Sequence, residues 1–472
     1  QFMGYKTEFL ILTTEIASDK IIILMTPDSN QLEEVVISLD SGGEIMKMNK
    51  NVSQISLSPK KLATIPNLGE KDIFRALQLL PGVSGTNESS SGLYIRGGTP
   101  DQNLVLLDGF TVYHVDHFYG FFSAFNSDVI KDIQLFKGGF PAEYGGRISS
   151  VMDLTGKTGN SNNFSLSAGL SLLSANATVE IPVGKKANLL ISGRRSYTDI
   201  LKSGLYNSIF DLYNDSGPTS DSNLPLQARV LQNQLQPSFY FYDLNAKFSY
   251  KPTDKDIISV SLYNGEDNLD SSRENQNIIG SGTDQERTIN ADIEDLLNWG
   301  NLGSSVRWAR QWSDKFYTNV VGAYSNYFSQ RKRINDITVQ LADSTITNKI
   351  GLIEDNDLKD YTLRIHNEYK INSKHSLEFG AQLTKNEVDY NYSINDTTTV
   401  IAQKDKGLLS TLYFQDKWNP TERLSLNGGI RATHFDLKDE IFYEPRLSIS
   451  YQLNDQIKLK GAWGKYYQFV NR

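Results

Sequence analysis

The chain has 472 residues, with 47 Lys and Arg against 55 Asp and Glu, and its formal net charge is −8. This acidic balance argues against a basic nucleic-acid-binding protein. No run of eighteen apolar residues occurs, which excludes a helical membrane span but leaves the half-apolar strands of a β-barrel possible. The absence of Cys excludes disulfides, thiolate metal sites and a Cys nucleophile.

The first 44 residues predict little structure of their own. Residues 1–30 hold two short strand patterns, 8–14 and 20–25, which are too few to bury a core, so we expect the remnant of a β domain whose beginning is missing. Residues 31–44 are predicted to be a linker. An extended, β-branched stretch lies within it, formed by Leu32, Glu33, Glu34, Val35, Val36 and Ile37.

Residues 45–158 predict a compact α+β unit. Ile73, Leu77 and Leu80 lie on one helical face of residues 70–80, and Pro81-Gly82 is a stop signal for that helix. Short β patterns follow at 93–96, 104–107, 133–137 and 149–154, separated by glycine pairs. We therefore expect a small mixed sheet with one helix.

Residues 159–472 change to long strands with a period of two. Tyr361, Leu363 and Ile365 alternate with polar neighbours, and so do Leu377, Phe379 and Leu383. We count thirteen such strands between 163 and 469. Short connections are predicted at 184–186, 252–255, 312–314, 372–373, 419–421 and 454–455. Long polar connections are predicted at 198–238, 266–297, 330–359 and 391–406.

Short turns at one end and long connections at the other are typical of an antiparallel outer-membrane β-barrel. Trp312 and Trp418 beside short turns, with Tyr390 and Tyr392 at the opposite strand end, fit interfacial aromatic girdles, although ordinary strand packing is the alternative for each. A sheet in the bilayer has to close, because its backbone groups find no water there. Thirteen strands cannot be the whole of an even-stranded barrel.

Four segments of the α+β unit resemble the plug domain of TonB-dependent outer-membrane receptors. They are residues 72–83 (DIFRALQLLPGV), 94–98 (YIRGG), 101–110 (DQNLVLLDGF) and 136–150 (FKGGFPAEYGGRISS). Residues 444–468 resemble a strand pair of the family's barrel, and the segment up to residue 37 resembles the tail of a carboxypeptidase-regulatory-like domain. The resemblance implies a plug inside a barrel of about 22 strands, of which about 13 are present. We therefore expect a fragment truncated at both ends.

The family resemblance also implies a function. It implies active import of a scarce, bulky solute across the outer membrane, iron–siderophore complexes being the leading substrates, with energy from TonB, ExbB and ExbD. The plug and the N-terminus are then on the periplasmic side, and outer-membrane lipid surrounds the barrel. A SusC-like importer of glycans or peptides with a surface lipoprotein is one alternative. A passive structural or adhesive barrel is another. No cofactor is implied.

The resemblance makes Leu32–Ile37 a TonB box, a segment suited to strand addition to a partner's sheet edge. The last strand or linker of the truncated domain is the alternative. The resemblance further implies that Arg96 and Arg147 lock the plug to the barrel through inward-facing Glu residues, and strand parity makes Glu368 and Glu378 the candidates. Solvated pairing of these arginines with any nearby acid is the other interpretation.

A polar and aromatic segment of the plug is predicted to face the solute. It comprises Tyr113, His114, Asp116, His117, Phe118 and Tyr119. Two His and an Asp this close are compatible with a metal or ferric chelate, but no spacing here is diagnostic, and a polar turn over aromatic packing is favoured over direct metal ligation.

The remaining signals point away from catalysis. Residues 266–297 carry nine acids and two bases, which predicts a solvated acidic loop or, less commonly, attraction of cations. No G-x-S-x-G, P-loop, H-E-x-x-H or G-x-G-x-x-G pattern occurs, and the chain has only five His. We therefore expect no enzyme activity.

Overall fold

The computed structural model describes residues 46–48, 52–59, 71–85, 92–118, 120–208, 237–279, 287–341, 343–395, 397–454 and 456–470. The expected β-domain remnant over residues 1–30 and the linker over 31–44, with Leu32–Ile37, lie outside the described residues. Two sheets account for most of the described part of the chain. We call the smaller unit, built from β1–β10 and α1, the inner unit, and the larger sheet the wall.

The inner unit is a mixed sheet with one short helix. Its main sheet has the order β1-β2-β9-β10-β5-β6, and β10 pairs in parallel with β5. These strands are β1 (Met46–Met48), β2 (Gln54–Leu57), β5 (Asn103–Leu107), β6 (Phe110–Thr111), β9 (Ile130–Phe136) and β10 (Ser150–Gly156). Two small hairpins pair β3 (Val83–Ser84) with β4 (Tyr94–Ile95), and β7 (Asp116–His117) with β8 (Phe122–Ser123). A 3₁₀ helix covers Pro100–Gln102.

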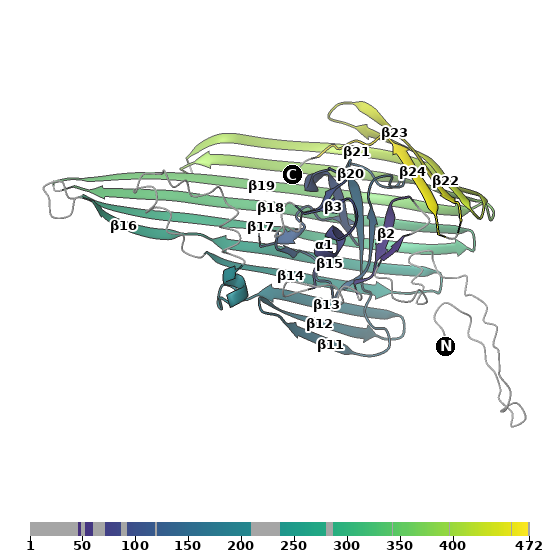
Figure 1. Cartoon of the computed structure of the whole chain (residues 1–472), viewed down its shortest axis with the longest axis horizontal. Helices are drawn as coiled ribbons and strands as arrows, with labels where there is room; N and C mark the ends of the chain where they lie inside the picture. The colour runs from purple at the N-terminus through teal and green to yellow at the C-terminus, as the bar shows by residue number, and fades with distance from the viewer. Residues whose placement is uncertain are drawn as a thin grey trace, which may run out of the picture.

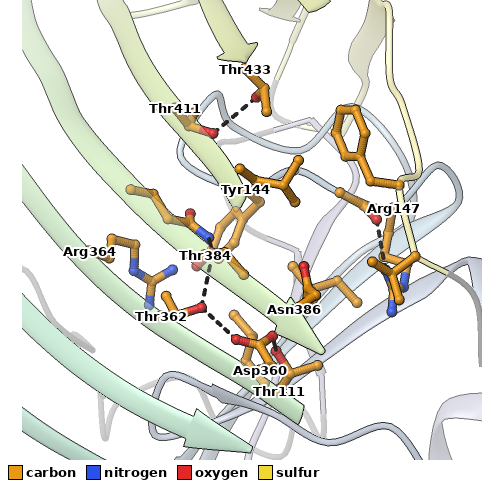
Figure 2. A pocket seen from close by; sticks show the side chains of 18 of the residues that line it. Thr111, Tyr144, Arg147, Asp360, Thr362, Arg364, Thr384, Asn386, Thr411 and Thr433 are labelled. Atoms are coloured by element: carbon orange, nitrogen blue, oxygen red, sulfur yellow. Dashed lines mark hydrogen bonds between the residues drawn. The ribbon is translucent and has the colours of Figure 1, made fainter. Parts of the chain in front are cut away.

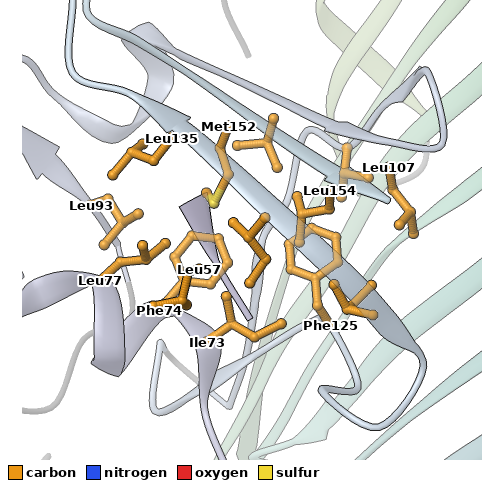
Figure 3. Close-up of a cluster of buried hydrophobic side chains, with 14 of the residues drawn as sticks. Leu57, Ile73, Phe74, Leu77, Leu93, Leu107, Phe125, Leu135, Met152 and Leu154 are labelled. Atoms are coloured by element: carbon orange, nitrogen blue, oxygen red, sulfur yellow. The ribbon is translucent and has the colours of Figure 1, made fainter. Parts of the chain in front are cut away.

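The predicted helix is confirmed as α1 (Ile73–Gln78). It begins at Ile73 because the Asp72 carboxylate caps it, accepting a hydrogen bond from the Arg75 backbone N–H. Ile73 and Leu77 are buried in the core between α1 and the sheet, together with Leu135 and Leu154 (Figure 3). No described helix has the length and apolar character needed to cross a membrane.

The wall is an antiparallel sheet of 14 strands that curves round without closing, with β11 and β24 as its edges in the described part of the chain (Figure 1). Its main path has the thirteen strands predicted, and β16 pairs beside it with β17. The strands are β11 (Ser165–Leu170), β12 (Ser174–Val183), β13 (Ala187–Ser196), β14 (Ser238–Tyr250), β15 (Asp256–Asp270), β16 (Arg273–Ile279), β17 (Arg287–Ser313), β18 (Phe316–Gln340), β19 (Thr345–Lys370), β20 (His375–Ile394), β21 (Thr398–Thr421), β22 (Leu424–Phe435), β23 (Glu440–Gln452) and β24 (Lys458–Gly464).

The short turns lie at or within three residues of their predicted positions, but three predicted long loops are wrong. Residues 266–297, 330–359 and 391–406 are mostly strand, because β15 to β17, β18 and β19, and then β20 and β21 continue through most of them. At about 3.3 Å per residue, the 26 residues of β19 far exceed a hydrocarbon core of about 30 Å. Figure 1 shows β16 to β19 extending well past the inner unit.

The two faces of the wall differ in chemistry. Leu363, Ile365 and Leu383 are exposed on the outer face, whereas Arg364 and Thr384, one residue along, line a cavity on the inner face. This alternation matches a sheet with lipid outside and a polar lumen inside. Trp312 and Trp418 are also exposed, beside short turns as predicted.

The girdle prediction for Tyr390 and Tyr392 is wrong. Both share the inward parity of Thr384 on β20, and the Tyr390 hydroxyl donates to Glu354 at 3.0 Å. On the outer face, the Tyr324 and Tyr361 rings have centroids 5.1 Å apart, and Tyr361 pairs with Lys385 in the middle of β20. The sequence therefore predicts the wrong face for Tyr390 and Tyr392.

Candidate functional site

The interface between the inner unit and the wall gathers most of the buried charge of the molecule. Of the two arginines predicted to lock it, Arg96 lies at the free surface of the inner unit. It donates to Ser53 Oγ at 3.2 Å, within the inner unit itself. Its backbone has φ of 50° in the tight turn between β4 and the following glycines. Arg96 therefore does not reach the wall in this arrangement.

The second arginine, Arg147, donates to the Gly146 carbonyl within the inner unit at 2.8 Å and lines the cavity between the inner unit and the wall, away from the predicted glutamates. Its guanidinium lies 5.8 Å from the ring centre of Tyr113 and lines the same cavity as Asp360 of β19. The Tyr113 hydroxyl and Thr111 Oγ1 both donate to Asp360, at 3.1 and 3.2 Å. The acid that meets this part of the inner unit is thus Asp360, eight residues before Glu368 on the same strand face.

Glu368 and Glu378 are inward-facing, as strand parity predicted, but their partners are not Arg96 or Arg147. Glu378 pairs with Lys417 and accepts a hydrogen bond from Gln415 at 3.0 Å. Glu368 lies 3.4 Å from His366, whose other ring nitrogen is 3.6 Å from Glu143 of the inner unit. Since the wall supplies its own cations here, the two glutamates need no arginine from the inner unit.

The guanidinium groups that cross the interface belong instead to the wall. Arg431 on β22 donates to the backbone carbonyls of Ala142 and Glu143, at 3.3 and 2.9 Å. Arg446 on β23 donates to the carbonyl of Tyr144 at 2.7 Å, and also to those of Phe140 and Pro141. Fully buried Glu444 lies 3.4 Å from each arginine and balances one of their two positive charges.

A further anchor is Asp108, in the turn between β5 and β6. Its carboxylate accepts from Lys247 Nζ at 2.6 Å and from Ser261 Oγ at 3.0 Å, both on the wall. Its backbone carbonyl accepts from Ser305 Oγ at 2.9 Å. Asp108 has φ of 48° and the following Gly109 has φ of 94°, where an added Cβ would lie 2.9 Å from a Val321 methyl carbon. The left-handed turn therefore brings the carboxylate to the wall.

His117 is fully buried against two wall carboxylates, which contradicts its predicted role in facing a solute. Its Nδ1 lies 2.6 Å from Asp267, and its Nε2 lies 3.5 Å from Asp243. Burial alone lowers the pKa of the imidazole, but the carboxylates of Asp267 and Asp243 outweigh burial and raise that pKa from 6.5 to about 9. A protonated His117 thus holds the inner unit to the wall.

Arg194 joins the same cluster from β13. It donates to Asp243 at 2.7 Å and to the Ser123 carbonyl of the inner unit at 2.8 Å. Asp267 lies within the stretch predicted to be a solvated acidic loop, and Asp295 of that stretch pairs with Arg331 at 3.3 Å. Part of the predicted loop acidity is therefore bound in strands.

The rest of the predicted solute-facing segment is also engaged. Phe118 is buried in an aromatic cluster with Phe239 and Tyr206, and its backbone N–H donates to Asp267 at 3.1 Å. His114 Nε2 accepts a hydrogen bond from Trp299 at 2.8 Å and lies 3.3 Å from Asp116. Tyr119 lies outside the described residues. His114 and His117 have separate partners, and among the described residues no group of three or more His, Cys, Asp or Glu side chains is placed so that it could hold a metal ion.

A polar cavity of about 80 Å³ separates the inner unit from β19–β22. Figure 2 shows Thr362, Thr384, Thr411 and Thr433 on its wall side, with Arg364 nearby. The Thr362 and Thr384 hydroxyls are 3.0 Å apart, and so are those of Thr411 and Thr433. We call these four side chains the threonine ladder. The Tyr144 hydroxyl donates to Asp153 at 2.9 Å, and burial raises the pKa of the Asp153 carboxyl to about 6.

A curved antiparallel sheet with an apolar outer face, wrapped around a small α+β unit that it grips through buried charges, defines a plugged outer-membrane receptor. The family description "TonB-dependent Receptor Plug Domain" matches residues 50–151, and "TonB dependent receptor-like, beta-barrel" matches residues 220–469. The chain belongs to the TonB-dependent receptor family. A search of curated proteins found no match.

Solved structures share the fold at low sequence identity. A double mutant of the ferric enterobactin receptor PfeA from Pseudomonas aeruginosa is 15% identical with a TM-score of 0.56, covering 89% of this chain and 62% of that one. The siderophore receptor PirA from Acinetobacter baumannii is 16% identical with a TM-score of 0.56, at the same coverages. The outer membrane transporter YddB from Escherichia coli is 12% identical with a TM-score of 0.59, covering 90% and 63%. The chain thus spans less than two thirds of their length.

Proposed function

We propose that this chain is part of a TonB-dependent importer that carries a scarce, bulky solute across the outer membrane, with iron–siderophore complexes as the favoured substrates. One observation carries the proposal. The inner unit is pinned to the wall by buried charges, and the cavity beside it is only about 80 Å³. A bulky solute therefore cannot pass along this part of the interface until the inner unit moves, and this movement needs energy.

The energy has to come from outside the outer membrane, which holds no ATP. We propose that TonB, energised by ExbB and ExbD, engages Leu32–Ile37 from the periplasm by strand addition and pulls on the inner unit. The inner unit and the N-terminus then face the periplasm, and the long ends of β17–β21 face outward. This orientation gives the short turns to the periplasmic side, as in other outer-membrane barrels.

Side chains above the inner unit support a solute with aromatic and anionic groups. Tyr327 and Trp299 contact His114 at the top of the inner unit. Arg331 and Arg333 share the inward parity of Tyr327 along β18 and flank a single acid, Asp295, at 3.3 and 3.7 Å. Guanidinium groups bind oxyanions and stack on aromatic rings, so this surface fits an oxygen-rich ferric chelate. The neighbouring structures PfeA and PirA are described as a ferric enterobactin receptor and a siderophore receptor.

Deletion of Leu32–Ile37 tests the proposal. In host cells supplied with radioactive iron as a ferric siderophore, the deletion should abolish uptake and leave binding at the cell surface intact, because only energy coupling is lost. A variant with residues 38–43 deleted instead is the matched control for linker length. Uptake that survives both the box deletion and a protonophore would favour a passive barrel. Binding of a glycan together with a co-purifying lipoprotein would favour a SusC-like importer.

A further inference from the structure

The wall contacts the inner unit in two different ways. On the side of β13–β17, six apolar or aromatic wall residues join the buried clusters of the inner unit. They are Leu190, Phe239, Phe241, Tyr263, Leu269 and Trp299. On the side of β19–β23, no described wall residue belongs to such a cluster. The first contact is apolar and excludes water, and the second is polar.

The ionic contacts between the inner unit and the wall also differ between the two sides. On the β13–β17 side, the inner unit contributes charged side chains, Asp108 and His117, each within 2.6 Å of a charged group of the wall. Separating such pairs in a water-excluded site leaves uncompensated buried charges, which costs several kcal/mol each. Attachment on this side is therefore difficult to break.

On the β19–β23 side, the ion pair between the two parts in the described residues is that of His366 with Glu143, which is longer, at 3.6 Å, and the shorter contacts use neutral groups of the inner unit. Arg431 and Arg446 donate to backbone carbonyls of residues 140–144. A carbonyl of this kind can be replaced by water or by an oxygen of a passing solute, with one hydrogen bond exchanged for another. The inner unit can therefore leave this side of the wall at lower cost.

The cavity lies on this second side. Its wall carries one threonine hydroxyl on each of four consecutive strands, β19 to β22, in the threonine ladder. Three guanidinium groups also line it, Arg147 from the inner unit and Arg364 and Arg431 from the wall, together with the carboxylates of Glu143 and Asp360. The lining is thus rich in hydrogen-bonding groups, and its guanidinium groups outnumber its carboxylates by one.

We propose that the solute passes the inner unit along β19–β22, over the threonine ladder, while the inner unit stays attached to β13–β17. The lining suits an oxygen-rich solute with anionic groups, because guanidinium groups bind oxyanions and hydroxyls exchange hydrogen bonds as the solute moves. This route rests on the proposed function, since it assumes an energised movement of the inner unit.

The absence of Cys from the chain allows a direct test, because a single introduced thiol is then the only labelling site in the chain. Thr384→Cys lies on the ladder, and Ser261→Cys lies on the opposite side, at Asp108. The two positions are matched, since Thr384 is 7% and Ser261 is 4% exposed. Each variant is expressed in host cells and treated with a membrane-impermeant maleimide, with and without a protonophore.

The route predicts that Thr384→Cys is labelled several-fold faster in energised cells than in protonophore-treated cells, whereas Ser261→Cys stays unlabelled in both. Surface immunolabelling verifies that both variants are present, and Thr411→Cys repeats the ladder test if Thr384→Cys does not fold. Energy-dependent labelling of Ser261→Cys, alone or equal to that of the ladder, overturns the route but leaves the proposed importer intact. Labelling of neither position also overturns the route, and the deletion of Leu32–Ile37 then decides the importer separately.

Discussion

The inner unit and the wall are built from opposite arrangements of side chains. In the inner unit, apolar residues such as Phe74, Ile133 and Leu154 form a buried core, and polar residues lie outside. In the wall, apolar residues such as Leu363 and Leu412 lie outside, and charged residues face inward. The first is stabilised by removing apolar surface from water, and the second needs lipid around it.

Because of this difference, we expect the inner unit and the wall to respond differently to force and to solvent. The wall is a continuous ladder of backbone hydrogen bonds between neighbours, with up to 25 paired positions in the β18–β19 hairpin. In the hydrocarbon no water competes for these groups, so separating two strands there leaves backbone groups without partners at a high cost. The inner unit has short strands and a single small core, and it can change its contacts with the wall while the wall persists.

The largest effect is expected in the core of the inner unit. Leu154→Ala should lower the free energy of unfolding of that unit by about 2–5 kcal/mol, because Leu154 is fully buried and its loss leaves a cavity. Denaturant unfolding followed by near-ultraviolet circular dichroism measures the change, and the far-ultraviolet β signal of the wall should persist. Leu79→Ala, at an exposed leucine of the same unit, is the control, with a change within about 0.5 kcal/mol. If Leu154→Ala lost the near-ultraviolet and the far-ultraviolet signals at the same denaturant concentration, the inner unit and the wall would not unfold independently, which would contradict this prediction.

A slightly smaller effect is expected from a charge on the outer face of the wall. Leu363→Arg should destabilise the wall by about 2–4 kcal/mol in vesicles, because the guanidinium would lie in hydrocarbon. Leu363→Met keeps the volume and the apolar character and is the control, with a change below about 1.5 kcal/mol. Urea unfolding in vesicles and in detergent measures both variants. An equal effect of the two substitutions would show that this face does not contact lipid.

The period-two pattern predicted which residues face out, because lipid selects apolar residues at every second position of strands such as 361–371. The same signal failed beyond the bilayer. At residues 330–350 the strands extend past the inner unit (Figure 1), so Asn335, Asp336 and Lys349 form strand without alternation, and the sequence predicts a loop there. Hydrophobic periodicity reports the surroundings of a strand and not its hydrogen bonding.

The candidate site was predicted less completely than the fold. The alternation of side chains along β19 predicts correctly that Glu368 faces inward. Asp360 and Arg364 face the same way, and the alternation does not show which position along the strand contacts the inner unit. Asp108 lies in residues 101–110, which resemble the family's plug, yet no local pattern indicates that its turn brings the carboxylate to Lys247. Such pairs depend on the docking of two separately folded units, which local sequence does not encode.

The effect of pH tests the charged attachment of the inner unit to the wall. Because the folded-state pKa of His117 is about 9 against 6.5 for a free imidazole, its stabilisation is fully present below pH 6.5 and is lost as pH rises through about 9. The loss amounts to up to about 3 kcal/mol. Limited proteolysis of the detergent-solubilised receptor should therefore cut the inner unit faster at pH 10 than at pH 6. His117→Asn should remove most of this pH dependence, and His375→Asn, at a half-exposed wall histidine, should leave it unchanged. A pH dependence that persists in His117→Asn would show that a group other than His117 governs the attachment.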